Sequence, residues 1–232
     1  MHSVETGGMV DGPGIRYVVF LSGCNLRCKY CHNPDTWKLH NGQLLTVGEL
    51  MRDIKKYQSY LKHSGGGVTI TGGEPLMQAD FLAELLAACK ANGLHTALDT
   101  SGNSTRNVAE NVLKYTDLLL LDIKSINPTT YKELTGVSLD RTLELLRLAE
   151  HLEIPIWVRF VLVPGLTDNF DDIQKLADFL EPFVNVVKVE VIPFHKMGEY
   201  KWEELGLTYE LADVEPPSKA DVERAQAILE VL

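Results

Sequence analysis

The sequence predicts an α/β protein with six parallel strands in an open sheet, either a partial barrel or a curved doubly wound sheet. Six short apolar runs recur along the chain, each followed by a helical pattern, and no two runs are joined by a two-residue hairpin. This alternation favours parallel βα units over an antiparallel sheet. Six units are two short of a closed eight-stranded barrel, so we expect the sheet to stay open. A length of 232 residues suits one domain, over residues 1–232.

The first βα unit shows both patterns clearly. A buried strand is predicted at residues 17–21, because the run consists of β-branched, aromatic and aliphatic residues and is flanked by glycines on both sides. Thr46 and Glu49 then have the spacing of a capping box. An apolar stripe at helical spacing runs from Leu50 to Leu61, so a helix should begin just after Thr46.

The same unit then repeats along the chain. Further strands are predicted at residues 68–71, 96–98, 118–121, 155–163 and 187–192, and helices around 82–92, 108–113 and 139–152. Polar motifs follow these strands one after another. In both candidate architectures the working residues lie at the carboxyl ends of the strands, so the polar motifs should meet at one edge.

Composition narrows the function classes. A hydrophobic fraction of 45% and a charged fraction of 23% are ordinary for a globular protein. No apolar run approaches the ~20 residues that span a bilayer, and no secretory signal precedes Gly14, so we expect a cytoplasmic protein without a membrane segment. The formal charge of −10, with no basic run, argues against a nucleic-acid partner.

Three of the four cysteines lie within eight residues. Cys24, Cys28 and Cys31 have the spacing Cys-x3-Cys-x2-Cys, which suits zinc or an iron–sulfur cluster. Zinc normally takes four ligands, but the chain has no second pair of cysteines, and His32 is too close to be a comfortable fourth. A zinc loop with a distant ligand and a disulfide pair remain the alternatives. A four-iron cluster on three cysteines would leave one iron open to a small molecule.

This spacing, with Tyr30 before the last cysteine, resembles the radical S-adenosylmethionine enzymes. The resemblance implies a partial (β/α)6 barrel, a [4Fe-4S] cluster on the three cysteines, and S-adenosylmethionine bound at the open iron beside Tyr30 and His32. Cys89 lies on the apolar stripe of a helix. We therefore expect Cys89 to be a buried free thiol rather than a fourth ligand.

A glycine-rich turn follows the second strand. Gly72, Gly73 and Glu74 stand between that strand and a helix, where a backbone without side chains can approach a ligand closely. Two glycines after a strand are more often only a turn. Together with the cysteine loop, however, they resemble the family's motif for the methionine end of S-adenosylmethionine, in which the glycines matter more than the carboxylate.

The next two strands end in charged residues. Asp99 and Thr100 end one strand, and Asp122, Ile123 and Lys124 end the next. One reading is a structural ion pair between neighbouring strand ends. The resemblance implies instead that this group orients the amino, carboxylate and ribose groups of the cofactor. In that reading a monovalent cation is expected at Asp99, Thr100 and Asp122.

Two further residues stand near later strand ends. Arg159 lies inside an apolar strand, where an unpaired cation is costly, so it needs a carboxylate or a ligand. His195 follows the sixth strand and is either a rim residue or, by the resemblance, a contact to the adenosyl group.

The segment Glu5–Arg16 resembles the beginning of glycyl-radical-enzyme activases, and Asp11 in it is a candidate for docking the partner. Residues 32–88 contain no cysteine, so the ferredoxin-like insert of several such activases is absent. Ser64–Gly67 and Val163–Gly165 fit the activases that act on pyruvate formate-lyase. Members of the family usually carry several more residues ahead of His2, which leaves open whether Met1 is the natural start.

The resemblance implies that reductive cleavage of S-adenosylmethionine gives a 5′-deoxyadenosyl radical, which takes a hydrogen atom from a glycine of pyruvate formate-lyase. It also implies flavodoxin or a similar reductant, and we expect a monomer. Alternatives are an activase of another glycyl-radical enzyme and, in a different class, a non-catalytic iron–sulfur electron carrier or zinc-binding module.

Overall fold

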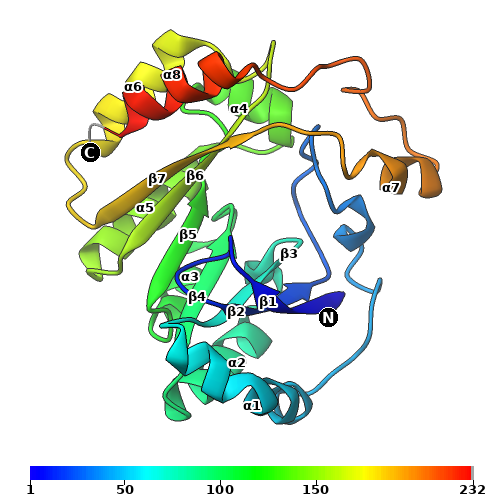
Figure 1. The fold of residues 1–232 in the computed structure, drawn as a ribbon, viewed down its shortest axis with the longest axis vertical. Helices are drawn as coiled ribbons and strands as arrows, with labels where there is room; N and C mark the ends of the chain where they lie inside the picture. The colour runs from blue at the N-terminus through cyan, green and yellow to red at the C-terminus, as the bar shows by residue number, and fades with distance from the viewer. Residues whose placement is uncertain (231–232) are drawn as a thin grey trace.

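The computed structural model describes residues 1–230 and contains one seven-stranded sheet whose strands lie in chain order (Figure 1). The strands are β1 (Ser3–Gly8), β2 (Arg16–Leu21), β3 (Gly67–Gly72), β4 (His95–Thr100), β5 (Leu118–Asp122), β6 (Ile156–Leu162) and β7 (Val186–Pro193). Strands β2 to β7 all pair in parallel, and β1 pairs antiparallel with β2. The sheet does not close, so the prediction of an α/β fold with an open, partial barrel is confirmed.

Eight α-helices accompany the sheet within the described residues. They are α1 (Val47–His63), α2 (Ala79–Ala91), α3 (Arg106–Leu113), α4 (Pro128–Thr135), α5 (Asp140–His151), α6 (Phe170–Leu180), α7 (Glu199–Glu204) and α8 (Lys219–Leu229). Helices α1, α2, α3 and α5 pack side by side in that order, and α8 packs against α6 and β7. None of these helices is long and apolar enough to cross a membrane.

The first helix begins where its capping box predicts. The Thr46 hydroxyl accepts a hydrogen bond from Glu49 N, and the Glu49 carboxylate accepts one from Thr46 N at 2.8 Å. Leu50, Ile54 and Leu61 form the buried stripe. The bounds predicted for the helices around 82–92, 108–113 and 139–152 lie within three residues of those of α2, α3 and α5.

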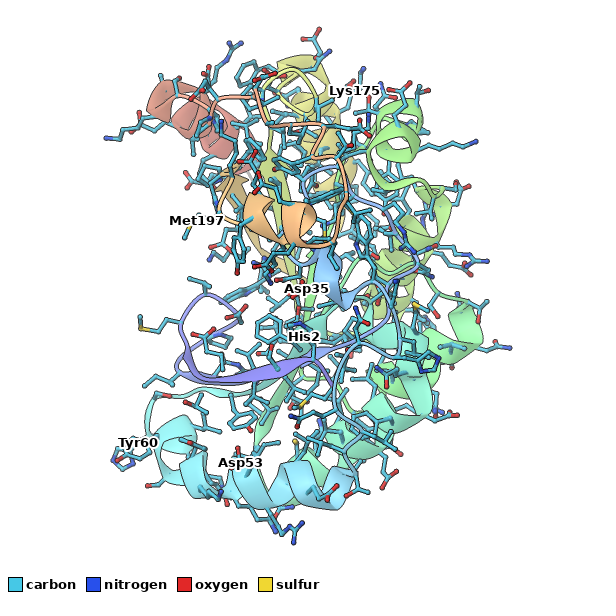
Figure 2. The ribbon with its side chains drawn as sticks, turned by 90° about the vertical axis from the view of Figure 1, so that its right-hand side faces the viewer. His2, Asp35, Asp53, Tyr60, Lys175 and Met197 are labelled. Carbon is cyan, nitrogen blue, oxygen red and sulfur yellow. The ribbon has the colours of Figure 1, made fainter. Side chains whose placement is uncertain are left out.

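The antiparallel strand β1 was missed by sequence reasoning. Its residues Ser3–Gly8 are mostly exposed and lack the apolar alternation of a half-buried strand. The preceding residues anchor it: the Met1 ammonium donates to the Gln43 carbonyl oxygen, and His2 Nε2 lies 2.9 Å from Asp35 Oδ2 (Figure 2). Contacts far apart in the sequence therefore define this strand.

Side chains of β5 alternate between the two faces of the sheet. Leu119 and Leu121 join the main core, which the sheet shares with the helices. Leu118 and Leu120 lie on the opposite, inner face. All four are almost completely buried, so β5 is covered on both faces, as its unbroken apolar run predicts.

The inner face changes from apolar to charged along the strands. Its apolar part consists of Ala97, Leu118 and Leu120, with the partly buried Trp157 packed against them. Two residues further along their strands, on the same face, lie Asp99, Asp122 and Arg159, because side chains of a strand repeat every second residue. A charged rim thus stands above an apolar floor.

Candidate active site

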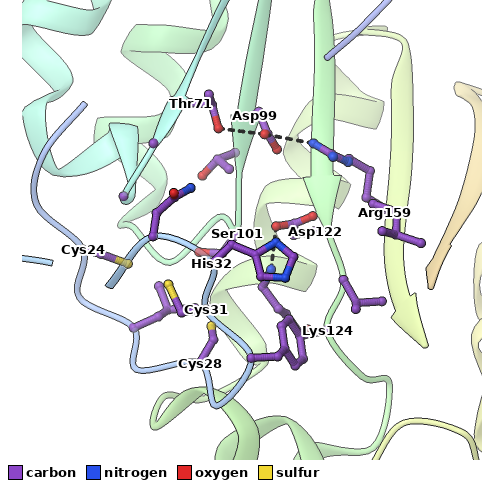
Figure 3. A pocket seen from close by; sticks show the side chains of 18 of the residues that line it. Cys24, Cys28, Cys31, His32, Thr71, Asp99, Ser101, Asp122, Lys124 and Arg159 are labelled. Carbon is purple, nitrogen blue, oxygen red and sulfur yellow. Dashed lines mark hydrogen bonds and ion pairs between the residues drawn. The ribbon is translucent and has the colours of Figure 1, made fainter. Parts of the chain in front are cut away.

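The cysteine loop, residues 23–37, follows the carboxyl end of β2 and is held by hydrogen bonds within itself and to the end of α4. Gly23 N donates to Thr36 O at 2.6 Å within the loop, and Arg27 N donates to the carbonyl oxygen of Thr135 at the end of α4 at 2.8 Å. All three cysteines of the loop line one pocket of about 540 Å³ (Figure 3). A pocket of this size suits a small-molecule ligand.

The three cysteines of the loop line the pocket, whereas Cys89 lies in the main core. Burial raises the pKa of Cys24 to about 11 and that of Cys28 to about 12, so both are protonated without a metal. A metal that binds them must displace those protons. Cys89 is fully buried in the main core, where its Sγ lies 3.7 Å from Met51 Sδ. The expectation of a buried free thiol is confirmed.

A preformed zinc site has no support in residues 1–230. No group of three or more His, Cys, Asp or Glu side chains there is arranged to hold a single metal ion. The three cysteines share a pocket without converging on one point.

Two ion pairs lie opposite the cysteine loop. Arg159 Nη1 donates to Asp99 Oδ2 at 3.0 Å, and the Thr71 hydroxyl donates to the same oxygen at 2.7 Å (Figure 3). Lys124 Nζ lies 2.6 Å from Asp122 Oδ2. Of the two partners predicted for Arg159, a carboxylate or a ligand, the structure shows the carboxylate of Asp99. These pairs also line the pocket, so they are both structural ion pairs and candidates for ligand contact.

The ion pairs keep the two cations charged. Asp99 raises the pKa of Arg159 above its usual value, against the effect of burial. Burial opposes the charge of Lys124 too, but Asp122 and Tyr30 raise its pKa well above the usual value. Two fixed positive charges therefore face the pocket at neutral pH.

The cation expected at Asp99, Thr100 and Asp122 stays a prediction. Each of these three side chains already has a protein partner: Arg159, Glu74 and Lys124, in that order. The Lys124 ammonium and the Arg159 guanidinium group already supply positive charge next to Asp122 and Asp99.

Glu74 is placed differently from the glycines before it. Its carboxylate is almost completely buried and accepts hydrogen bonds from the Thr100 hydroxyl, from Ser101 N and its hydroxyl, and from Leu76 N. It is not among the residues that line the pocket, and neither is the fully buried Ile123. Glu74 joins the loop after β3 to the end of β4, and direct contact with a ligand stays a prediction for both residues.

Both glycines of the motif line the pocket, and close packing also requires them. A Cβ on Gly73 would lie 2.2 Å from the Gly23 carbonyl oxygen and 3.3 Å from Cys24 Cβ. Gly72 has φ +117°, and its Cβ would lie 2.3 Å from Leu21 N. The turn after β3 thus supports the cysteine loop directly, so the two motifs form one structural unit.

His32 and His195 meet at the rim of the pocket. Their ring centroids are 4.2 Å apart, and His32 Nε2 lies 3.0 Å from the His195 carbonyl oxygen. Burial lowers the pKa of His32, and both rings line the pocket. Sequence reasoning placed both residues in the site but did not predict their contact.

Three buried polar atoms of pocket-lining residues have no hydrogen-bond partner within residues 1–230. They are the Tyr30 hydroxyl, Arg159 Nε and His195 Nδ1. Buried polar groups are nearly always paired, so such atoms indicate a bound polar molecule.

Other pocket residues were missed by sequence reasoning. Among them are Asn33, Trp37, Thr71, Ser101, Glu190 and Phe194. Thr71 and Ser101 adjoin predicted site residues, so a wider search along each strand end would have found them. No pattern in the sequence indicates that Trp37 lines the pocket.

Asp11 lies in the loop between β1 and β2. Its neighbour Val10 lines the pocket, and the Asp11 carbonyl oxygen accepts a 2.6 Å hydrogen bond from the Thr69 hydroxyl. Burial raises the pKa of the Asp11 carboxyl, and the charge of Asp99 raises it further. The structure thus brings Asp11 near the charged rim.

Comparisons with known proteins show similarity over most of the chain. Residues 18–180 match the family model described as the radical SAM superfamily. The pyruvate formate-lyase 1-activating enzyme of Escherichia coli (strain K12) is 44% identical over 99% of this chain and 94% of its own length. The pyruvate formate-lyase-activating enzyme of Staphylococcus aureus (strain USA300) is 47% identical, over 97% of this chain and 92% of its own.

Solved structures show the same fold. A domain of a pyruvate-formate lyase-activating enzyme from Bacteroides vulgatus has 26% identity and a TM-score of 0.60, over 71% of this chain and 93% of that one. Streptococcus suis SuiB bound to S-adenosylmethionine has a TM-score of 0.70 at 18% identity, over 95% of this chain and 47% of that one.

The Glu74 network predicts a specific loss of stability. Glu74→Gln puts an amide N–H₂ group against hydrogen-bond donors, so we expect it to destabilise the protein by about 1–3 kcal/mol. The matched control is Glu84→Gln, an exposed position on α2, which should change stability by less than about 0.5 kcal/mol. Urea unfolding followed by circular dichroism measures both. Equal midpoints for the two variants would contradict the network's role.

Proposed function

The chain belongs to the radical SAM superfamily and, within it, to the pyruvate formate-lyase-activating enzymes, and we propose that it activates pyruvate formate-lyase by forming a glycyl radical on that enzyme. The cofactors of this family are a [4Fe-4S] cluster and S-adenosylmethionine. The observation that carries the proposal is the pocket, in which three cysteines face two fixed ion pairs.

The residues present fit these cofactors. Three thiols and no fourth cysteine line the pocket, which suits a four-iron cluster with one iron open to a ligand. The unpaired polar atoms of Tyr30, Arg159 and His195 suit a polar small molecule beside it. A cluster held by Cys24, Cys28 and Cys31 would supply the one-electron chemistry for reductive cleavage of S-adenosylmethionine and so for hydrogen-atom removal from a glycine of the partner.

The chain's own residues hold and orient the reactants. We assign Cys24, Cys28 and Cys31 to three irons of the cluster. Lys124 and Arg159 are suited to a carboxylate, because both stay charged in a buried site.

Hydrogen-bond acceptors, glycines and aromatic side chains are assigned to the rest of the cofactor site. Asp99 and Asp122 retain oxygen lone pairs for amino or hydroxyl groups, and Gly72 and Gly73 let a ligand approach the backbone. His195 is assigned to the adenosyl end. Tyr30 and Phe194 are buried at the pocket and exclude water from it.

Further assignments concern the partners. Asp11 is assigned to docking of the pyruvate formate-lyase segment that carries the glycine, because it lies near the charged rim. We assign the electron supply to flavodoxin or a similar reductant, and take the protein to work as a single-domain monomer. The thiolate ligands need a reducing compartment, which supports the cytoplasm as the place of the reaction.

The test is direct. Anaerobically reconstituted and reduced protein is mixed with S-adenosylmethionine and pyruvate formate-lyase, and electron paramagnetic resonance should show a glycyl radical. A lyase in which the target glycine is alanine is the control and should stay silent. A signal only with a different glycyl-radical enzyme would overturn the partner, and absence of any S-adenosylmethionine cleavage would favour an electron carrier.

The four cysteines should behave unequally. Cys24→Ala, Cys28→Ala and Cys31→Ala should each lose the cluster, because three ligands are the fewest that hold it. Cys89→Ala should keep it, since Cys89 lies in the main core. Iron and sulfide content after anaerobic reconstitution measures the outcome. A Cys89→Ala protein that folds but binds no iron would refute the assignment of ligands.

Adding one methyl group should lower iron loading at Gly73 but not at Gly48. Gly73→Ala places a Cβ 2.2 Å from the Gly23 carbonyl oxygen, so the cysteine loop must shift and iron loading should fall severalfold. Gly48→Ala is the matched control, because no atom lies within 4 Å of the added Cβ. Its loading should match the parent protein. Normal iron content in Gly73→Ala would show that the loop tolerates the displacement.

A further inference from the structure

Arg16 is a fully buried cation to which the proposed function gives no role. It begins β2, and its side chain has no exposed surface. Burial lowers its pKa to about 10, so it remains charged at neutral pH. In the described part of the chain Arg16 forms no ion pair with a carboxylate, although the charges of Asp11 and Asp117 act on it from a longer distance and raise its pKa. A buried cation without such a partner is costly, so its hydrogen bonds must hold it for a structural or functional reason.

Three hydrogen bonds fix the guanidinium group. Arg16 Nη2 donates to the Val68 carbonyl oxygen at 2.7 Å, and Nη1 lies 3.1 Å from His95 Nδ1. Nε donates to the Thr69 hydroxyl at 2.9 Å. That hydroxyl in turn donates to the carbonyl oxygen of Asp11 at 2.6 Å. A continuous chain of hydrogen bonds therefore runs from Arg16 through β3 to the loop between β1 and β2.

This loop, residues 9–14, reaches the pocket. Val10 is one of the residues that line it. The Asp11 carboxyl is partly buried, and the charges of Asp99 and Arg159 both act on its pKa. The loop thus forms part of the wall next to the charged rim, although it precedes β2 and the cysteines in the sequence.

Glycines allow the loop to pack this closely. Gly12 has φ +126°, and a Cβ there would lie 3.3 Å from Arg16 Nε. Gly14 has φ +66°, and its Cβ would lie 2.5 Å from the Ser64 carbonyl oxygen. A Cβ on Gly66 would lie 1.9 Å from the Ile15 carbonyl oxygen. Two motifs that sequence analysis singled out separately, residues 5–16 and 64–67, are therefore complementary surfaces of one contact.

We propose that Arg16 is a positioning residue, which acts through Thr69 to hold the loop 9–14 at the pocket so that Val10 and Asp11 can receive the protein substrate. Arg16 affects the docking of the protein substrate, and this inference rests on the proposed function. Arg16 is not among the residues that line the pocket, so it has no direct part in the bond rearrangements there.

Thr69 offers the sharpest test, because its hydroxyl is the link between Arg16 and Asp11. Thr69→Val removes the hydroxyl at nearly constant shape, whereas Thr69→Ser retains it. Thr116→Val is the matched control, since Thr116 is also buried, and within residues 1–230 its hydroxyl bonds only to the Val112 carbonyl oxygen. The reconstituted holoenzyme is measured in two ways: by hydrogen–deuterium exchange of residues 9–14, and by KM and kcat for radical formation on pyruvate formate-lyase.

Thr69→Val should raise exchange in residues 9–14 roughly tenfold and KM for the lyase by a similar factor, which is the loss of about one buried hydrogen bond. Its kcat and its cleavage of S-adenosylmethionine without lyase should not change. Thr69→Ser and Thr116→Val should stay close to the parent protein in every measurement.

Arg16→Lys should have a larger effect, because an ammonium cannot reproduce the planar fork. Unchanged exchange in a folded Thr69→Val protein would overturn the positioning role, and faster exchange with an unchanged KM would overturn the link to docking. If the parent protein forms no radical on the lyase, the proposed function fails, whereas the exchange measurement still decides whether Arg16 and Thr69 position the loop.

Discussion

The ion pair between Asp99 and Arg159 is the interaction on which the pocket depends. It joins β4 to β6 across the intervening strand β5, with 3.0 Å between Arg159 Nη1 and Asp99 Oδ2. A charge on the inner face of a sheet is tolerable only with a partner, so neither side chain could stay there alone. The pair also leaves Arg159 Nε without a partner in the described residues. The interaction that stabilises the inner face thereby leaves one strong donor for a ligand.

The parallel arrangement turns this local pair into a site. Since all strands from β2 to β7 run the same way, their carboxyl ends gather the polar groups at one rim, and their earlier residues form an apolar floor of Ala97, Leu118 and Leu120. An apolar, water-poor floor lowers the local dielectric constant and strengthens each charged contact above it. The order of residues along β5, apolar and then Asp122, is enough to produce this gradient.

Sequence reasoning reached the parallel strands, the cysteine loop and the strand-end charges because each depends on a short local pattern. It missed β1, whose exposed residues pair with β2 only because distant groups such as Asp35 hold its beginning. It also could not see that the Glu74 carboxylate accepts hydrogen bonds from Thr100 and Ser101. A carboxylate next to two glycines can point to either side of the turn, and only the donors of Thr100 and Ser101 decide which. Periodicity carries no information about contacts of this kind.

An open sheet leaves an edge beyond β7 that other segments must cover. After β7 the chain returns over the cysteine loop, where Trp202 Nε1 donates to the Cys31 carbonyl oxygen at 2.9 Å and the Trp202 ring meets Trp37 edge-on at 5.1 Å. Lys29 pairs with Glu210 at 2.8 Å on the same segment. These contacts fix the loop from its outer side, while Gly73 supports it from the sheet. Side chains rather than further strands therefore complete the wall.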